Sequence, residues 1–231
     1  MEDRTKGSYF IGEYVWYVFA AAIAAYLIER RVPSLAPEHI ALRIQRYTWH
    51  YEGESGEANR LEVRFLSNQF ACLPHDPIAV RPHAQITADQ DSLRNQMRCA
   101  VEAHMQPLIE RVYDQTHLSR NAQWLLVADT CAAMFLHLGQ ALQDSERAQR
   151  EGMAFIRSPH SPMNNDKTCY ISLEYLDHRE TFRAHGGCCR YYTVSETGKD
   201  YCTTCVLRKP EDRDQRLLDY MAKKYAQAAA S

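Results

Sequence analysis

The sequence predicts an α+β fold: a helix-rich domain with a small β-hairpin or sheet and a C-terminal cysteine-rich segment. Three observations lead to this prediction. Apolar stretches with helical spacing fill much of the chain, and alternating segments within residues 40–66 predict a hairpin. Four of the eight cysteines fall between Cys188 and Cys205. The chain has 231 residues, 45% hydrophobic and 24% charged, which is typical of a globular protein.

Length and charge limit the classes of function. The length suits one domain, residues 1–231, with the cysteine segment 186–208 inside it. The formal net charge is only −2, so no bulk field would attract nucleic acid, and nucleic acid is not an expected partner.

The first expected helix runs from Tyr9 to Val32 and ends before Pro33. Its apolar part, Tyr14 to Ile28, is shorter than the about 20 residues that a membrane-spanning helix needs. We therefore interpret it as a buried core helix. Arg30 and Arg31 beside it leave peripheral membrane association open. The mixed charges at the N-terminus do not resemble a secretory signal, which favours the cytoplasm.

A β-hairpin is expected next. Ile40–Tyr51 and Leu61–Leu66 are predicted strands, because apolar and charged residues alternate in the second of them. A polar, glycine-containing turn, Glu52–Glu57, separates the two strands. The following stretch, Ala71–Ala88, contains three prolines and is expected to be irregular.

Further helices are expected in the rest of the chain. Apolar residues line one face from Leu93 to Val112, and Pro107 should kink or break this helix. Ser119 is the expected cap of a central, largely apolar helix that reaches about Leu142. Three more elements are predicted: a helix at Glu146–Ile156, a weak strand at Thr168–Leu176, and a last helix from Pro210 to about Tyr225.

The cysteine segment carries the strongest chemical signal. Gly186, Gly187, Cys188 and Cys189 are followed after twelve residues by Cys202 and Cys205 in a Cys-x-x-Cys arrangement. Thiolates are soft ligands that select zinc, copper(I) or iron–sulfur clusters. Four of them satisfy either one tetrahedral zinc or a 2Fe-2S cluster.

The adjacent pair favours the cluster over zinc. Neighbouring side chains of an extended backbone point to opposite faces, so Cys188 and Cys189 would chelate one small ion poorly. We expect Gly186 and Gly187 to supply unusual dihedral angles that let both sulfurs converge. A zinc site and a redox-active dithiol or disulfide remain open alternatives.

The run Gly-Gly-Cys-Cys-Arg-Tyr-Tyr, followed by Tyr-Cys-x-x-Cys-Val-Leu, resembles the C-terminal signature of the FhuF-like ferric-siderophore reductases. The resemblance implies a 2Fe-2S cluster whose ligands are Cys188, Cys189, Cys202 and Cys205. The family pattern has ten residues between the pairs, and this chain has twelve. The extra length is expected around the turn at residues 195–199, because loops accept insertions cheaply.

This resemblance implies one-electron reduction of ferric iron bound to a siderophore, of hydroxamate type, with release of ferrous iron in the cytoplasm. No catalytic residue is expected beyond the cluster. The sequence has no nucleotide-binding glycine motif, so an external donor such as a ferredoxin would supply electrons. Two alternatives stay open: a zinc-stabilised binding module without redox activity, and a siderophore-binding domain without a redox role.

The other candidate residues have modest roles. Arg190, Tyr191 and Tyr192 are candidates for contact with the siderophore, or for covering the cluster. His185 is an alternative ligand. The four scattered cysteines are expected to be small buried hydrophobic residues: Cys72, Cys99, Cys131 and Cys169. Six cations make the ligand region locally basic, which would suit an acidic donor: Arg179, Arg183, Arg190, Lys199, Arg208 and Lys209.

Overall fold

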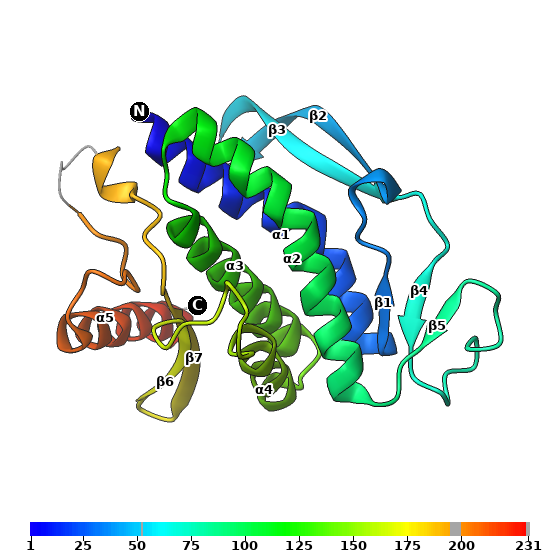
Figure 1. The fold of residues 1–231 in the computed structure, drawn as a ribbon. Helices are drawn as coiled ribbons and strands as arrows, with labels where there is room; N and C mark the ends of the chain where they lie inside the picture. Colours follow the sequence, from blue (N-terminus) through cyan, green and yellow to red (C-terminus); the bar gives the residue numbers. More distant parts are fainter. Residues whose placement is uncertain (52, 195–199, 230–231) are drawn as a thin grey trace. The chain divides into compact units, whose positions relative to one another are not determined.

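The computed structural model describes residues 1–51, 53–194 and 200–229 and confirms the α+β class (Figure 1). The chain groups into two compact units. The first contains Met1–Glu13 and Leu108–Ser231, and the second contains Tyr14–Pro107. The expectation of a single domain over residues 1–231 stays a prediction.

The described part of the chain forms five α-helices: α1 Asp3–Glu29, α2 Gln90–Thr116, α3 Arg120–Ala141, α4 Ser145–Ile156 and α5 Pro210–Ala229. The Ser119 cap is confirmed, since its side chain accepts a hydrogen bond from the Ala122 N–H at 3.3 Å. The first helix begins and ends earlier than predicted: α1 starts at Asp3 instead of Tyr9 and ends at Glu29 instead of Val32. It ends there because Arg30 adopts a left-handed conformation with φ 57°, which stops the helix before Pro33.

Of the kink or break predicted at Pro107, the break is wrong, because α2 is continuous. Pro107 lies on the exposed side of the helix. The opposite side carries a buried stripe at spacings of three and four residues: Leu93, Met97, Val101, Met105, Ile109 and Val112. Burying six apolar side chains outweighs the about 3 kcal/mol that an internal proline costs.

The second unit contains two sheets. In the first, β4 (Phe70–Cys72) pairs antiparallel with β1 (Arg31–Pro33) and parallel with β5 (Ala84–Ile86). The region expected to be irregular therefore contains two short strands. In the second sheet, β2 (Ile40–Tyr51) pairs with β3 (Glu54–Phe65). Strand β2 has the predicted bounds. Strand β3 starts earlier than the predicted Leu61, because the chain turns at Gly53, with φ 85°, and pairing with β2 resumes at Glu54.

The first unit contains a third sheet. β6 (Cys169–Tyr175) confirms the weak strand prediction and pairs with β7 (His178–Ala184), which was not predicted. Their hairpin turns at Leu176, which has φ 52°. Leucine is not a typical turn residue, so the sequence carried little signal for this turn. α5 packs on β6, and α3 packs on β7 and α4.

Apolar helix faces build the core of each unit. In the first unit, Val127, Cys131 and Phe135 of α3 are fully buried, and Phe135 contacts Phe155 of α4 with ring centroids 5.7 Å apart. In the second unit, Phe19 and Ile23 of α1 are fully buried. By length and composition, α1 and α3 also meet the requirement for a membrane span. The apolar window is 44% buried in α1 and 72% buried in α3, and the α3 value is that of a core helix.

Candidate metal centre

The four cysteines of the candidate centre lie in the first unit, between β7 and α5. β7 ends at Ala184, and Cys188 and Cys189 come after His185, Gly186 and Gly187. Cys202 and Cys205 form a turn closed by a hydrogen bond of 3.0 Å from the Cys205 N–H to the Cys202 carbonyl. Cys205 is buried and the other three are half-buried, so the segment limits solvent access to the sulfurs.

The four thiols influence one another's pKa in pairs. Cys189 interacts with Cys202, Cys202 with Cys205, and Cys205 with Cys188. The hydrogen bond from Cys202 lowers the pKa of Cys189 to about 6, and the same contact raises the pKa of Cys202. Burial raises the pKa of Cys188. Of these two thiols, Cys189 is therefore the one on which a negative charge is favoured.

The side chains of this segment decide which kinds of group it could hold. Within residues 1–51, 53–194 and 200–229, no three His, Cys, Asp or Glu side chains form a group that could hold a metal ion. By their chemistry, Cys188, Cys189, Cys202 and Cys205 supply an all-cysteine donor set, which either one tetrahedral zinc or a 2Fe-2S cluster takes. The donor set also consists only of thiols, which are soft ligands. The residues present therefore fit the cluster that the sequence predicts.

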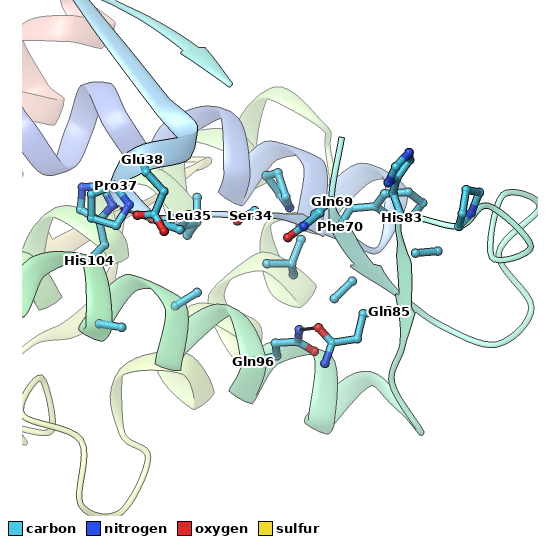
Figure 2. Close-up of a pocket in the computed structure, with 18 residues that line it drawn as sticks. Ser34, Leu35, Pro37, Glu38, Gln69, Phe70, His83, Gln85, Gln96 and His104 are labelled. Atoms are coloured by element: carbon cyan, nitrogen blue, oxygen red, sulfur yellow. Dashed lines mark hydrogen bonds between the residues drawn. The ribbon is translucent and has the colours of Figure 1, made fainter. Parts of the chain in front are cut away.

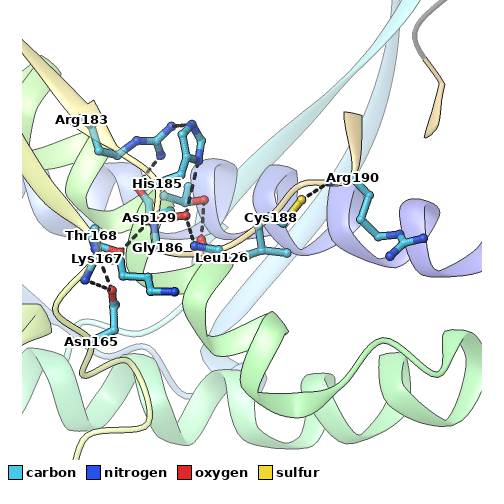
Figure 3. Close-up of polar contacts among 12 residues, drawn as sticks. Leu126, Asp129, Asn165, Lys167, Thr168, Arg183, His185, Gly186, Cys188 and Arg190 are labelled. Carbon is cyan, nitrogen blue, oxygen red and sulfur yellow. Dashed lines mark hydrogen bonds and ion pairs between the residues drawn. The ribbon is translucent and has the colours of Figure 1, made fainter. Parts of the chain in front are cut away.

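A buried carboxylate holds the first cysteine pair in place (Figure 3). Asp129 of α3 is 1% exposed. One of its oxygens accepts hydrogen bonds from the Gly186 N–H at 2.8 Å and from the Thr168 hydroxyl at 2.7 Å, and the other accepts from the Gly187 N–H at 2.9 Å. A buried charge is tolerated only when it is well hydrogen-bonded, and here three donors satisfy it. Asp129 thereby fixes the backbone immediately before Cys188.

Two basic side chains complete this network. His185 Nδ1 lies 3.4 Å from Asp129, and its Nε2 lies 2.9 Å from the Arg183 guanidinium (Figure 3). Arg183 also donates to the Asp129 backbone carbonyl at 2.6 Å. Both ring nitrogens of His185 therefore face this network, and neither is left over for a metal. Sequence reasoning missed Asp129, although a single acidic residue within an apolar helix was a usable signal.

The two glycines act differently from the prediction. Gly53 is the one glycine with positive φ in the described part of the chain, so Gly186 and Gly187 do not supply unusual dihedral angles. They are needed for close approach. A Cβ on Gly186 would lie 2.3 Å from Thr168 Oγ1, and one on Gly187 would lie 3.0 Å from the Leu125 side chain. Glycine lets this strand end reach Asp129.

The first turns of α1 hold the other side of the cysteine pair. The Ser8 hydroxyl donates to the Cys189 carbonyl at 2.8 Å. Arg190 adopts a left-handed conformation with φ 60°, pairs with Glu2 at 2.6 Å and donates to Thr5 at 3.3 Å. Its charge is therefore already paired within the chain.

The two predicted substrate tyrosines differ in exposure. Tyr191 is 45% exposed. Tyr192 is half-buried and packs edge-on against Tyr201, with ring centroids 5.4 Å apart. Their contact with a siderophore, like that of Arg190, stays a prediction. The turn expected at residues 195–199 lies outside the described residues.

The remaining cysteines do not all follow the prediction of burial. Cys72 and Cys131 are fully buried, and burial raises the pKa of the Cys131 thiol to about 12. Cys99 is exposed on α2 and Cys169 is half-buried. The prediction was wrong for Cys99, whose sulfur accepts a hydrogen bond from the Arg98 guanidinium at 3.3 Å. Cys169, the first residue of β6, is only partly covered.

The second unit contains a cavity of about 570 Å³ (Figure 2). Gln85 and Gln96 face each other at its rim and are joined by a hydrogen bond of 2.6 Å. His104 lies at its inner end, where its ring nitrogens meet the Leu35 carbonyl at 2.6 Å and the Tyr14 hydroxyl at 2.7 Å. Burial lowers the pKa of His104, so the ring stays neutral at physiological pH. The described lining of this cavity contains no thiol.

One comparison with known proteins identifies a family. A family model described as "Ferric iron reductase FhuF-like transporter" matches residues 8–182, which is more than half of the chain. The match ends before Gly186, so the cysteine segment lies beyond it. No curated protein and no solved structure matches the chain.

Proposed function

The chain belongs to the ferric iron reductase FhuF-like family, and on this premise we propose that it reduces ferric iron held by a siderophore. We propose that Cys188, Cys189, Cys202 and Cys205 bind a 2Fe-2S cluster for this reaction. The observation that carries the proposal is the set of four free, buried or half-buried cysteines in one segment, whose first pair follows a backbone held by the buried Asp129.

The reaction is a balanced one-electron step. Ferric iron in its oxygen ligands gains one electron from an external one-electron carrier of the ferredoxin class, and the carrier is oxidised. Oxygen donors hold the softer ferrous ion less tightly, so iron leaves the siderophore. A 2Fe-2S cluster, when bound, supplies one electron at a time, which matches this step. We expect a hydroxamate siderophore and release of the ferrous ion in the cytoplasm.

The residues of the chain perform the supporting work. Asp129 orients the backbone before Cys188, and Ser8 holds the carbonyl of Cys189. The Arg208 guanidinium is 7% exposed and donates to the Cys202 carbonyl at 2.9 Å, which fixes the second pair. A rigid, sparsely hydrated set of sulfurs changes little between redox states, and charge, hydrogen bonds and exposure set the potential.

The sequence shows no nucleotide-binding motif, so the reducing power arrives from a protein partner in this proposal. We place the reaction in the cytoplasm. The length and apolar character of α1 keep association with the inner face of the membrane within the proposal.

The iron and sulfide content of anaerobically purified protein tests the cluster. We expect about two irons and about two sulfides per chain, with charge-transfer bands in the visible spectrum. Cys205→Ser should lose the chromophore, because a hydroxyl is a poor ligand for a soft site. Cys131→Ser is the matched control, since Cys131 is buried in α3 away from the segment, and it should keep the colour.

Stopped-flow mixing of the chemically reduced protein with ferric siderophores then tests the reaction. Fast reoxidation and capture of the iron by a ferrous-specific chelator are expected. A colourless protein that contains zinc would support the binding-module alternative instead. Reoxidation no faster than without siderophore would rule out the reductase role and leave a sensor or storage role for the cluster.

A further inference from the structure

A cavity of about 380 Å³ lies in the first unit directly beside the cysteine segment. Cys188, Gly186 and Gly187 form one wall, and Leu118, Leu125 and Leu207 contribute apolar surface. Its volume lies within the range of about 300–1,000 Å³ that is common for small-molecule sites. The cavity therefore offers room for part of a ligand in contact with a cysteine that we assign to the cluster.

The charges around this cavity are all of one sign. Lys167 and Arg190 line it, and no described lining residue is a carboxylate. Arg190 is already paired with Glu2 at 2.6 Å. Lys167 is exposed and has no ion pair within the described residues, and its side chain extends toward the Gly186–Cys188 segment (Figure 3). One available cation among apolar walls suits a ligand with acceptor oxygens and a charge near zero or −1.

We propose that this cavity is the substrate dock: it takes the iron-bearing end of the ferric complex and seats it against Cys188. This inference rests on the proposed reduction of siderophore iron. The apolar walls contact the aliphatic parts of the chelate, and the Lys167 ammonium donates to its iron-bound oxygens. Electron transfer slows steeply with distance, so contact at Cys188 gives the shortest path from the sulfurs to the ferric ion.

The structure offers a matched comparison at the other end of α3. A second cavity of about 520 Å³ borders Thr203 and Thr204, the two residues between Cys202 and Cys205. Its two cations are both engaged, since Lys224 is paired with Glu180 at 3.0 Å and Arg183 donates to the Asp129 carbonyl at 2.6 Å. Neither is as available as Lys167. Asn121 lines the first cavity and Gln140 lines the second, and both are exposed amides on α3.

The test fills each cavity with one tryptophan. The probe is the gallium(III) complex of a trihydroxamate, which cannot be reduced under these conditions and reports binding alone. Isothermal titration of cluster-loaded protein should show that Asn121→Trp weakens binding at least about tenfold, equivalent to about 1.4 kcal/mol. Gln140→Trp should bind like the wild type. Asn121→Trp should also slow reoxidation by the ferric complex, with unchanged iron content.

Two further variants keep the test decisive. Leu207→Trp blocks the same cavity from a different segment and replaces Asn121→Trp if that variant does not fold. Lys167→Ala should weaken binding of the gallium complex, whereas Lys224→Ala should not. Equal binding by the wild type, Asn121→Trp and Leu207→Trp would overturn the dock, as would loss of binding in Gln140→Trp alone. Gallium binding is measured without electron transfer, so it tests the dock even if the reductase activity fails.

Discussion

At the scale of single residues, the candidate centre depends on a carboxylate that takes no part in its ligand set. Asp129 satisfies three donors at once, two of them backbone N–H groups of consecutive residues. Those donors would otherwise be buried without partners, and each unpaired group costs about 1–3 kcal/mol. Asp129 is thus a positioning residue for Cys188.

Asp129→Asn should loosen this end of the segment. The amide keeps the shape but replaces one acceptor oxygen by an N–H₂ donor, which would face the Gly187 N–H or the donors on the other side. We expect a loss of about 1–3 kcal/mol in the free energy of unfolding. Chemical denaturation measures this loss, and the rate of iron release to a chelator measures the retention of the cluster.

Asp166→Asn is the matched control, because Asp166 is an exposed carboxylate in the loop before Thr168. Its effect should stay within about 0.5 kcal/mol. If Asp129→Asn proves as stable as this control and releases iron no faster, the positioning role is refuted.

The cysteines and Asp129 differ in how visible they are in a sequence. Metal ligands recur at short spacings, so Cys202 and Cys205, three positions apart, can be recognised as candidate ligands from the sequence. Asp129 meets Thr168 at a separation of 39 residues and Gly186 at 57. A single sequence does not encode such a pairing locally, so only the fold reveals it.

At the scale of elements, long periodic segments were predicted well and short paired segments were not. β2 matches its predicted bounds, and α3 begins after the predicted Ser119 cap. β4 and β5 have three residues each: β4 depends on pairing with β1, about 40 residues away, and β5 depends on pairing with β4. The glycines before Cys188 were correctly singled out, but for backbone freedom rather than close approach.

The glycine argument leads to a prediction about packing. Gly186→Ala places a Cβ 2.3 Å from Thr168 Oγ1 and 2.4 Å from Asn165 Oδ1, so it must displace side chains that bind the Asp129 network. We expect a loss of about 1–3 kcal/mol in stability and a weakened cluster. Thermal unfolding and iron content measure the two effects.

Gly12→Ala is the opposite case within the same unit. Its Cβ would meet only Thr130 Oγ1, at 4.0 Å, and it lies inside α1, where alanine is favoured over glycine. It should stabilise the protein by about 0.5–1 kcal/mol. A similar loss in both variants would show that close approach is not what selects glycine at position 186.

At the scale of the whole molecule, electrostatics offers a donor protein little long-range guidance. The net charge is only −2. Three of the six cations that make the cysteine region basic are engaged inside the fold: Arg183 at Asp129 and His185, Arg190 at Glu2, and Arg208 at Cys202 and Asp200. Lys199 lies outside the described residues. Arg179 and Lys209 are exposed and have no ion pair in the described ranges.

This division of charges predicts a local salt effect on the donor reaction. Lys209 lies four residues after Cys205, whereas Arg179 lies at the far end of β7 from the cysteines. An acidic ferredoxin-class donor that docks at the cysteine segment should be attracted by Lys209 and not by Arg179.

The second-order rate constant for reduction of this protein by the donor should fall as salt shortens the screening length to about 10 Å at 0.1 M. Lys209→Ala should flatten that dependence and Arg179→Ala should leave it unchanged. Stopped-flow reduction by such a donor at several ionic strengths measures both slopes. Equal slopes in the wild type and Lys209→Ala would place the donor elsewhere on the protein, because an exposed cation beside the docking site must contribute to the field that the donor meets.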